Sequence, residues 1–310
     1  MNFRLPYKLR RVEGRKSRFK VIRAFQYFCY LFEVFAENFF IKHCSIPKYG
    51  LNQDGNRKEK VIVSLTSFPA RINEVYYAIK SLMIQSYQAD RIILWLSKEQ
   101  FPNGIDNPNL RALQQKGLEI VFVDDDLRSH KKYFYALQQQ KPDEVVITFD
   151  DDIIFEYDAI EKLIKTRQSY PDCIICNRGE TIKIKDHRFE PYSKWCILSK
   201  EGVDYPSMMI VPSTGAGCLY PYGIMPPCTF DVSKIKTVAF SADDLWMRFN
   251  SMQKGIKIKK SQPTNAILCQ VTNSQRVNLS QVNCIEGQND VAIANLEKEF
   301  PKSISILLQE

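Results

Sequence analysis

The sequence EVVITFDDDII, at residues 144–154, is the most informative stretch of the chain. Val145–Phe149 is a short apolar run rich in β-branched residues, which predicts a buried strand. Three carboxylates follow it directly: Asp150, Asp151 and Asp152. A hard divalent cation such as Mg²⁺ or Mn²⁺ would relieve their mutual repulsion, often while sharing a substrate's phosphates. On this stretch alone, a nucleotide-diphosphate site and a solvated acidic turn are equally consistent with the residues.

Predicted strands and helices alternate through the first half of the chain. Apolar patterns predict strands at residues 61–65, 91–96, 118–123, 144–149 and 173–176. They predict helices at residues 73–87, 109–116, 131–140 and 159–168. This alternation is typical of an α/β fold with a mostly parallel, twisted sheet and helices on both faces. Beyond residue 178 the pattern is less regular, and residues 205–230, with five prolines and three glycines, are expected to form a loop-rich substrate region.

Polar residues follow three of the predicted strands. Thr66 and Ser67 follow the first, the acidic cluster around Asp125 follows the third, and the triple Asp follows the fourth. Ligands of parallel sheets bind beyond the carboxyl ends of the strands, so these residues are expected to converge. No glycine-rich phosphate loop is present, which leaves nucleotide recognition to hydroxyls, backbone groups and Arg71, with a metal on the diphosphate.

Two further groups of charged residues are candidates for chemistry. Lys131 and Lys132 could neutralise phosphate, and a solvated helix start explains them equally well. Asp243 and Asp244 begin an apolar helical pattern, where capping would justify one carboxylate. Two of them beside Trp246 suggest a general base for an acceptor hydroxyl, a role typically worth ~10²- to 10⁴-fold in rate.

The positive charge of the chain is concentrated at its N-terminus. Residues 1–23 hold nine Lys or Arg and one Glu, which accounts for the whole formal charge of +8. Five phenylalanines then recur at helical spacing within residues 24–41, where the longest uncharged run is nine residues against the ~20 needed to span a bilayer. Residues 1–45 therefore fit peripheral contact with an anionic membrane, and equally a helix docked on the protein's own domain. No nucleic-acid-binding motif accompanies the basic arm.

The nine cysteines are odd in number and form no recognisable framework. They favour reduced thiols and a cytoplasmic protein, which on the membrane reading would sit on the inner face of the cell membrane. No secretion signal precedes the folded region, and this too favours the cytoplasm.

Several segments occur in a characteristic order. They are VSLTSFPARI, IILWLS with QFP, DLRSHKKYFYAL, VVITFDDDII, STGAGCLYP, ADDLW and GQND. Together they resemble bacterial glycosyltransferases of the GT-A fold that build cell-surface polysaccharide or lipopolysaccharide, over residues 60–299. The resemblance implies a hexosyltransferase-like enzyme that moves a sugar from a nucleotide-diphosphate sugar, a UDP-sugar above all, to a carbohydrate hydroxyl of a glycan acceptor. It implies Mn²⁺ or Mg²⁺ as cofactor and inversion as the expected outcome, while retention stays open.

The resemblance also implies roles for individual residues. Asp152 would bind the metal directly, and Asp150 would bind it from a position nearer the ribose. Asp244, or failing it Asp243, would be the base. The nucleotide-sugar pocket would be lined by Thr66, Ser67, Arg71, Asp125, Lys131, Lys132, Asp150, Asp151, Gly215 and Gly217. Many enzymes of this fold use a late histidine as a further ligand; the last one here is His187, so Asn289 or Asp290 is taken as its substitute.

The implied organisation has two parts. Residues 1–59 would comprise the basic arm, the amphipathic helix and a linker. Residues 60–310 would form the GT-A domain, with the nucleotide-sugar half at 60–177 and the acceptor half at 178–310.

Two other functions are alternatives to a transferase. An aspartate phosphatase would use Asp150 as nucleophile and Asp152 as acid, but it usually has a small or hydroxyl residue where this chain has Ile154. A non-catalytic carbohydrate- or metal-binding protein has no use for the Asp243–Asp244 pair. Turnover of a sugar donor would separate the transferase from the binding protein.

Overall fold

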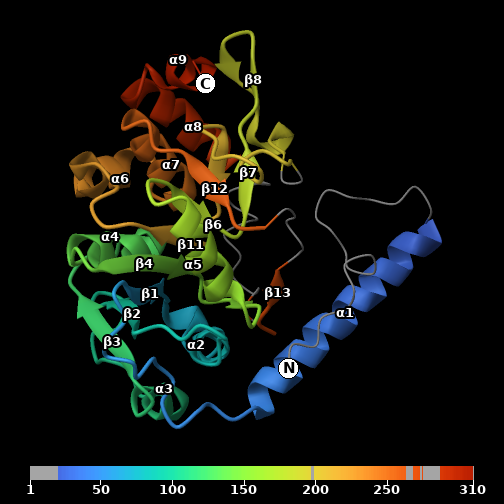
Figure 1. Ribbon diagram of the computed structural model, residues 1–310, viewed down its shortest axis with the longest axis vertical. Coiled ribbons are helices and arrows are strands. Elements are labelled where there is room, and N and C mark those ends of the chain that lie inside the picture. The colour runs from blue at the N-terminus through green and yellow to red at the C-terminus, as the bar shows by residue number, and fades with distance from the viewer. Residues whose placement is uncertain (1–19, 197–198, 263–267, 273, 275–286, 310) are drawn as a thin grey trace.

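A seven-stranded sheet forms the centre of the molecule (Figure 1). The computed structural model describes residues 20–196, 199–262, 268–272, 274 and 287–309. The strand order is β12-β6-β11-β4-β1-β2-β3, and all neighbours are parallel except β11, which runs antiparallel to β4 and β6. The strands are β1 (Lys60–Thr66), β2 (Arg91–Ser97), β3 (Leu118–Val123), β4 (Glu144–Phe149), β6 (Ile174–Cys176), β11 (Ala216–Tyr220) and β12 (Ile258–Lys260). The predicted α/β class with a mostly parallel sheet is confirmed.

Helices cover both faces of the sheet. The main ones are α2 (Val75–Met83), α3 (Pro108–Gln114), α4 (Lys131–Gln138), α5 (Ala159–Ser169), α6 (Val232–Val238), α7 (Asp243–Gln253), α8 (Gln288–Glu299) and α9 (Ser303–Leu308). Val63 of β1 shares one apolar core with Ile79 of α2 and Leu163 of α5. Ile62, the next residue of the same strand, faces Ala136 of α4 on the other side. This alternation along β1 is what buries both faces.

Shorter elements complete the fold. Three two-stranded sheets pair β10 (Ile210–Pro212) with β7 (Gly179–Thr181), β13 (Cys269–Gln270) with β5 (Ile153–Ile154), and β8 (Ile184–Lys185) with β9 (Arg188–Phe189). Single turns of 3₁₀ helix lie at η2 (Pro69–Arg71), η3 (Arg128–His130), η4 (Tyr192–Lys194) and η5 (Pro227–Phe230). Of these, η2 and η3 follow β1 and β3 at the edge where ligands of parallel sheets bind.

The prediction of a loop-rich segment over residues 205–230 is wrong at its centre. β11 lies there, fully buried between β4 and β6. Pro212 and Pro221 bound this part of the chain without interrupting the strand, because proline disrupts a sheet only where its missing N–H is needed. Gly217 has a φ of 102°, and the register with β4 shifts between Ala216 and Cys218, so the strand carries a bulge.

The predicted N-terminal helix is confirmed as α1 (Lys20–His43). It contacts α2, β5 and β13, and Ile41 packs near its C-terminal end in a small core with Ile154. Figure 1 shows its N-terminal half extending away from the central sheet. The basic arm at residues 1–19 lies outside the described residues. None of the helices in the described ranges combines the length and the hydropathy of a membrane span.

Candidate functional site

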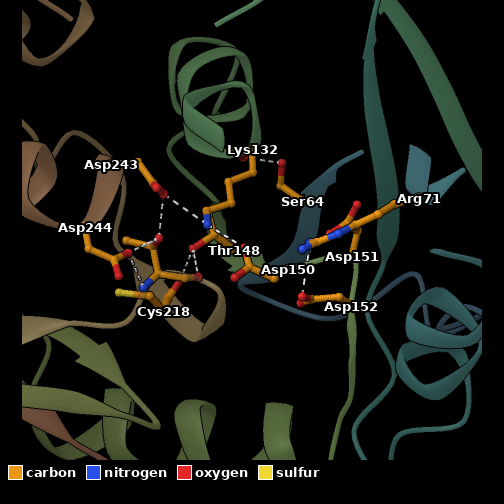
Figure 2. Close-up of polar contacts among 11 residues, drawn as sticks. Ser64, Arg71, Lys132, Thr148, Asp150, Asp151, Asp152, Cys218, Asp243 and Asp244 are labelled. Carbon is orange, nitrogen blue, oxygen red and sulfur yellow. Dashed lines mark hydrogen bonds and ion pairs between the residues drawn. The ribbon is translucent and has the colours of Figure 1, made fainter. Parts of the chain in front are cut away.

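The triple Asp lies at the carboxyl end of β4, beside residues that come from both halves of the chain (Figure 2). The backbone N–H of Asp150 donates to the carbonyl of Gly215 at 2.9 Å, which ties the end of β4 to the start of β11. Arg71 arrives from η2, and Lys132 from the first turn of α4. The antiparallel direction of β11 is what brings the residues before it to this edge.

Asp151 is a buried internal partner of the loop after β1. Its carboxylate accepts hydrogen bonds from Ser67 Oγ at 2.6 Å and from Arg71 Nη1 at 2.8 Å. The same Arg71 nitrogen lies 3.0 Å from Asp152 Oδ2. Burial raises the pKa of Asp151, while Arg71 and Ser67 oppose that rise. Asp151 therefore holds the loop in place, and of the two aspartates Asp152 is the more accessible to solvent.

Lys132 connects two acidic groups that are far apart in the sequence. Its ammonium group lies 2.6 Å from Asp150 Oδ1 and 3.0 Å from Asp243 Oδ2. Burial alone would lower the pKa of Lys132, but the carboxylates of Asp150, Asp243 and Asp244 outweigh it and raise the pKa. The lysine is thus held as a cation between the triple Asp and the first turn of α7.

Thr214 holds the two aspartates of α7 in place. Its backbone N–H donates to Asp244 Oδ1 at 2.8 Å, and its hydroxyl lies 2.8 Å from Asp243 Oδ2 and also contacts Asp244 Oδ1. Burial and then the charge of Asp243 raise the pKa of Asp244 to about 7, although Lys132 opposes this. Burial alone would raise the pKa of Asp243, but the charge of Lys132, together with further charges and hydrogen bonds around the carboxylate, outweighs it and lowers the pKa. One carboxylate is therefore poised near neutrality beside another that stays ionised.

The three cations assigned to the nucleotide are all paired with aspartates of the chain. Arg71 and Lys132 pair as described above, and Lys131 pairs with Asp126 while burial lowers its pKa. The nucleotide-binding role of these cations stays a prediction. A bound nucleotide would have to share or exchange the existing partners.

The other residues assigned to the nucleotide lie at the same edge. Thr66 donates its hydroxyl to the carbonyl of Trp95 at 2.8 Å, so this group is used within the sheet. The carboxylate of Asp125 is half-exposed, 3.8 Å from the ammonium group of Lys236. The partners of Thr66 and Asp125 in these two interactions are Trp95 and Lys236, and neither interaction involves the triple Asp.

The two glycines predicted to lie against the sugar are required for different structural reasons. A Cβ on Gly215 would lie 1.7 Å from Asp150 Oδ2, so only glycine lets the backbone approach this carboxylate. A Cβ on Gly217 would meet Asn177 Nδ2 at 2.6 Å and the ring of Phe149 at 2.9 Å. Packing inside the sheet explains Gly217 without a substrate, whereas Gly215 lies at the acidic site.

The donor set fits a hard divalent cation. The connected residues carry five carboxylates (Asp150, Asp151, Asp152, Asp243 and Asp244) and two cations (Arg71 and Lys132), which leaves an excess of negative charge. Among the described residues, no group of three or more His, Cys, Asp or Glu side chains is arranged to hold a metal. Mg²⁺ is usually bound by one or two carboxylates plus substrate phosphates and water, so Asp150 and Asp152 alone would suffice.

The proposed substitute for a late histidine ligand lies at the start of helix α8. Asp290 is in the first turn of α8, where its carboxylate accepts a hydrogen bond from the backbone N–H of Tyr192 at 2.7 Å. Its neighbour Asn289 is buried. His130 is buried too, with its ring nitrogens 2.8 Å from the Tyr133 hydroxyl and 2.9 Å from the Ala239 carbonyl, and burial lowers its pKa to about 4. The hydrogen bond to Tyr192 does not involve the triple Asp, and a metal-binding role of Asp290 stays a prediction.

Thr214 and the bridging position of Lys132 are two features of the site that were not predicted from the sequence. The signal for Thr214 was its place directly before Gly215 in the segment STGAGCLYP. A hydroxyl residue beside a glycine that must approach a carboxylate is a reasonable candidate for a polar contact. Lys132 gave no such signal, because its partners lie directly after β4 and on α7, and only the folded chain brings them together.

Comparison with known proteins gives distant structural likenesses. No protein-family model matches the chain, and no curated protein matches it in sequence. One similar solved structure is the mannosyltransferase PcManGT from Pyrobaculum calidifontis in complex with GDP-Man and Mn²⁺, with a TM-score of 0.46 and 12% identity over 91% of this chain and 81% of that one. Another is 4-diphosphocytidyl-2C-methyl-D-erythritol synthase, with a TM-score of 0.43 and 8% identity over 71% of this chain and 96% of that one. Likenesses this distant do not bear on which reaction the site performs.

Proposed function

We propose that this chain is a metal-dependent glycosyltransferase. It would move a sugar, a hexose in the first instance, from a nucleotide-diphosphate sugar to a carbohydrate hydroxyl of a surface glycan. A UDP-sugar is the expected donor. The observation that carries the proposal is the bridge from Asp150 through Lys132 to Asp243, which joins two conspicuous acidic motifs into one site. A transferase needs this adjacency, because the acceptor hydroxyl must attack the carbon that bears the leaving diphosphate.

Asp150 and Asp152 would hold the metal on the donor side. A bound divalent cation supplies Lewis-acid stabilisation of the leaving diphosphate. Arg71, 3.0 Å from Asp152 Oδ2, fixes the orientation of that carboxylate and is itself fixed by Asp151. Gly215 lets the backbone come close to the Asp150 carboxylate, with which a Cβ would collide.

Asp244 would be the base on the acceptor side. Its pKa, raised to about 7, suits a general base, because a base works best when its pKa lies near the operating pH. It would take the proton of the acceptor hydroxyl as that oxygen bonds to the anomeric carbon and the bond from this carbon to the diphosphate oxygen breaks. Attack on the face opposite the leaving group gives inversion, which is the outcome we expect.

The rival proposal of a non-catalytic binding protein explains the site less well. Burial of Asp244 next to the ionised Asp243 is unfavourable, and simple carbohydrate binding does not require it. Raised pKa values of this kind cluster at catalytic sites, where they serve proton transfer.

A donor panel tests the proposal. UDP-, GDP-, CDP- and dTDP-sugars would be assayed for hydrolysis and transfer with Mn²⁺, Mg²⁺ or EDTA, using the wild type and Asp152→Ala. Asp106→Ala is the matched control, since Asp106 is an exposed aspartate paired with Arg111 at the surface. We expect one donor to turn over only with metal, and this activity to be lost in Asp152→Ala alone. A folded wild type with neither turnover nor metal-dependent nucleotide binding would contradict the proposal and favour the binding protein.

A further inference from the structure

Helix α1 exposes a continuous apolar stripe. Its members are 44% to 81% exposed and recur every three or four residues: Val21, Phe25, Phe28, Phe32, Phe35 and Phe39. At 100° per residue these positions fall within a narrow sector of the helix, so the side chains point in one direction along its whole length. Scattered apolar residues are normal at a protein surface, but a stripe of five phenylalanines marks an interaction site.

The opposite side of α1 is buried and partly charged. Cys29, Glu33, Glu37 and Ile41 recur every four residues there and are all buried. The helix therefore has its carboxylates turned inward and its phenyl rings turned outward, the reverse of an ordinary surface helix of a water-soluble protein. Turning the helix over would not repair this, since Ile41 and its neighbours already pack on Ile154 and Val271.

In the sequence, a strongly basic segment leads into the same helix. Residues 1–23 hold nine basic residues and one acidic residue, and Lys42 and His43 close the last turn of α1. The rest of the chain is formally neutral, so the net charge lies directly beside the aromatic stripe in the sequence. An apolar face flanked by basic residues complements a surface that is both anionic and apolar beneath.

We propose that α1 lies flat in the interface of an anionic lipid bilayer. The phenylalanine stripe would enter the boundary between headgroups and acyl chains, and the basic residues would contact the phosphates of the headgroups. The helix is about 36 Å long at 1.5 Å per residue, and Arg23, Glu33, Glu37 and Lys42 are spread along it. These charges fit a helix in the plane of the membrane, and no helix in the described residues qualifies as a span. The inference does not rest on the proposed transferase activity.

A second copy of the chain is a poorer occupant of the same face. Two stripes that pack against each other would bring two N-terminal segments, each with a net charge of +8, onto one assembly. Like charges repel unless an anion intervenes, so the electrostatics oppose this dimer and favour the bilayer.

Vesicle sedimentation of the full chain tests the proposal. Neutral phosphatidylcholine vesicles would be compared with vesicles that also contain one quarter phosphatidylglycerol, at low and high salt. We expect at least tenfold tighter binding to the anionic vesicles, and at least a tenfold loss of that binding in the double variant Phe28→Glu, Phe35→Glu. The matched control is Tyr205→Glu, Tyr222→Glu, which changes two exposed aromatic residues off the helix and should bind as the wild type does.

Two further measurements separate insertion from surface attraction and from self-association. Phe32→Trp should show a blue-shifted emission that brominated lipids quench, because the stripe reaches the acyl boundary. Arg10→Glu with Arg11→Glu should weaken binding at low salt and leave the fold unchanged. The proposal would be overturned if the wild-type protein does not bind anionic vesicles. It would also be overturned if a folded Phe28→Glu, Phe35→Glu variant binds them as tightly as the wild type. A lipid-independent dimer that this variant dissociates would assign the face to a second copy.

Discussion

Gly215 and Asp150 approach each other so closely that no side chain fits between them. The Asp150 N–H donates to the Gly215 carbonyl at 2.9 Å, and a Cβ on Gly215 would lie 1.7 Å from Asp150 Oδ2. The glycine comes from the second half of the chain and the aspartate from the first. The position of the carboxylate at the end of β4 therefore depends on a residue that is 65 positions away in the sequence.

Gly215→Ala should displace the Asp150 carboxylate and abolish activity that depends on it. Forcing an extra carbon into a packed site typically costs about 1–3 kcal/mol of unfolding free energy. Gly55→Ala is the control, because a Cβ there meets nothing within 4 Å. Thermal unfolding and donor turnover would be measured for both variants. Equal turnover in the two would show that the contact at Gly215 is unimportant.

Lys132→Met should destabilise the protein strongly. Removing one partner of a buried ion pair leaves an uncompensated charge and typically costs about 3–5 kcal/mol. Here it would leave Asp150 and Asp243 without their shared cation. The control Lys98→Met breaks an exposed pair with Asp124, which is worth about 0–1 kcal/mol. Denaturant unfolding would measure the free energy of unfolding of both variants. Losses of similar size in the two would disprove the structural role of the bridge.

Asp244 should give the protein a distinctive pH dependence. Its pKa in the folded chain, about 7, lies above the ordinary aspartate value, so the folded state binds more protons between about pH 4 and 7. The stability that comes from this proton is present below about pH 4 and is lost as the pH rises through 7. Asp244→Asn should remove that slope. If both proteins lose unfolding free energy equally over this range, the raised pKa is wrong.

The same group should control the rate. A base must be ionised to accept a proton, so kcat/KM of the proposed transfer should fall about tenfold for each pH unit below 7. The stability contributed by the Asp244 proton has the opposite trend, because it increases as the pH falls over the same range. A profile that is flat from pH 5 to 7 would exclude Asp244 as the base.

Asp151 and Asp152 should separate into a structural and a metal-binding residue. Asp151→Asn weakens the buried contacts with Arg71 and Ser67, so we expect a lower unfolding temperature. Asp152→Asn should leave stability nearly unchanged and lower the affinity for Mn²⁺ in the presence of a nucleoside diphosphate. Calorimetric titration would give the Mn²⁺ affinity of each variant, and thermal unfolding would give its unfolding temperature. The reverse pattern would exchange their roles.

The first half of the fold was predictable because its strands are mostly apolar runs, fully buried in β4 and half-buried in the edge strand β3. β3 and β4 begin and end at the predicted residues, because runs of β-branched and aromatic side chains favour an extended backbone. β11 was missed because its sequence, AGCLY, contains no β-branched residue and lies between prolines. β11 is buried by its neighbouring strands, and the local sequence pattern holds no information about them.

The sequence located the acidic groups of the site, and topology explains why. Residues that follow parallel strands share one edge of the sheet, so the triple Asp and Ser67 had to be close. It did not reveal which cation pairs with which carboxylate. Lys132 appeared equally suited to phosphate or solvent until α7 placed Asp243 within 3.0 Å of it.

The position of β11 also constrains the order in which the chain can fold. β4 and β6 are separated by 24 residues in sequence and have no direct contact in the sheet, because β11, which is made later, must enter between them. On a ribosome the finished β4 therefore has an unsatisfied edge until residues 216–220 emerge. Pairing over such sequence distances is slow, so we expect this edge to acquire protection from hydrogen exchange late and together with β11. A nascent chain that stops before residue 216 would expose a hydrophobic strand that other chains can join, which makes the central strand of the native sheet the main aggregation risk of its precursor.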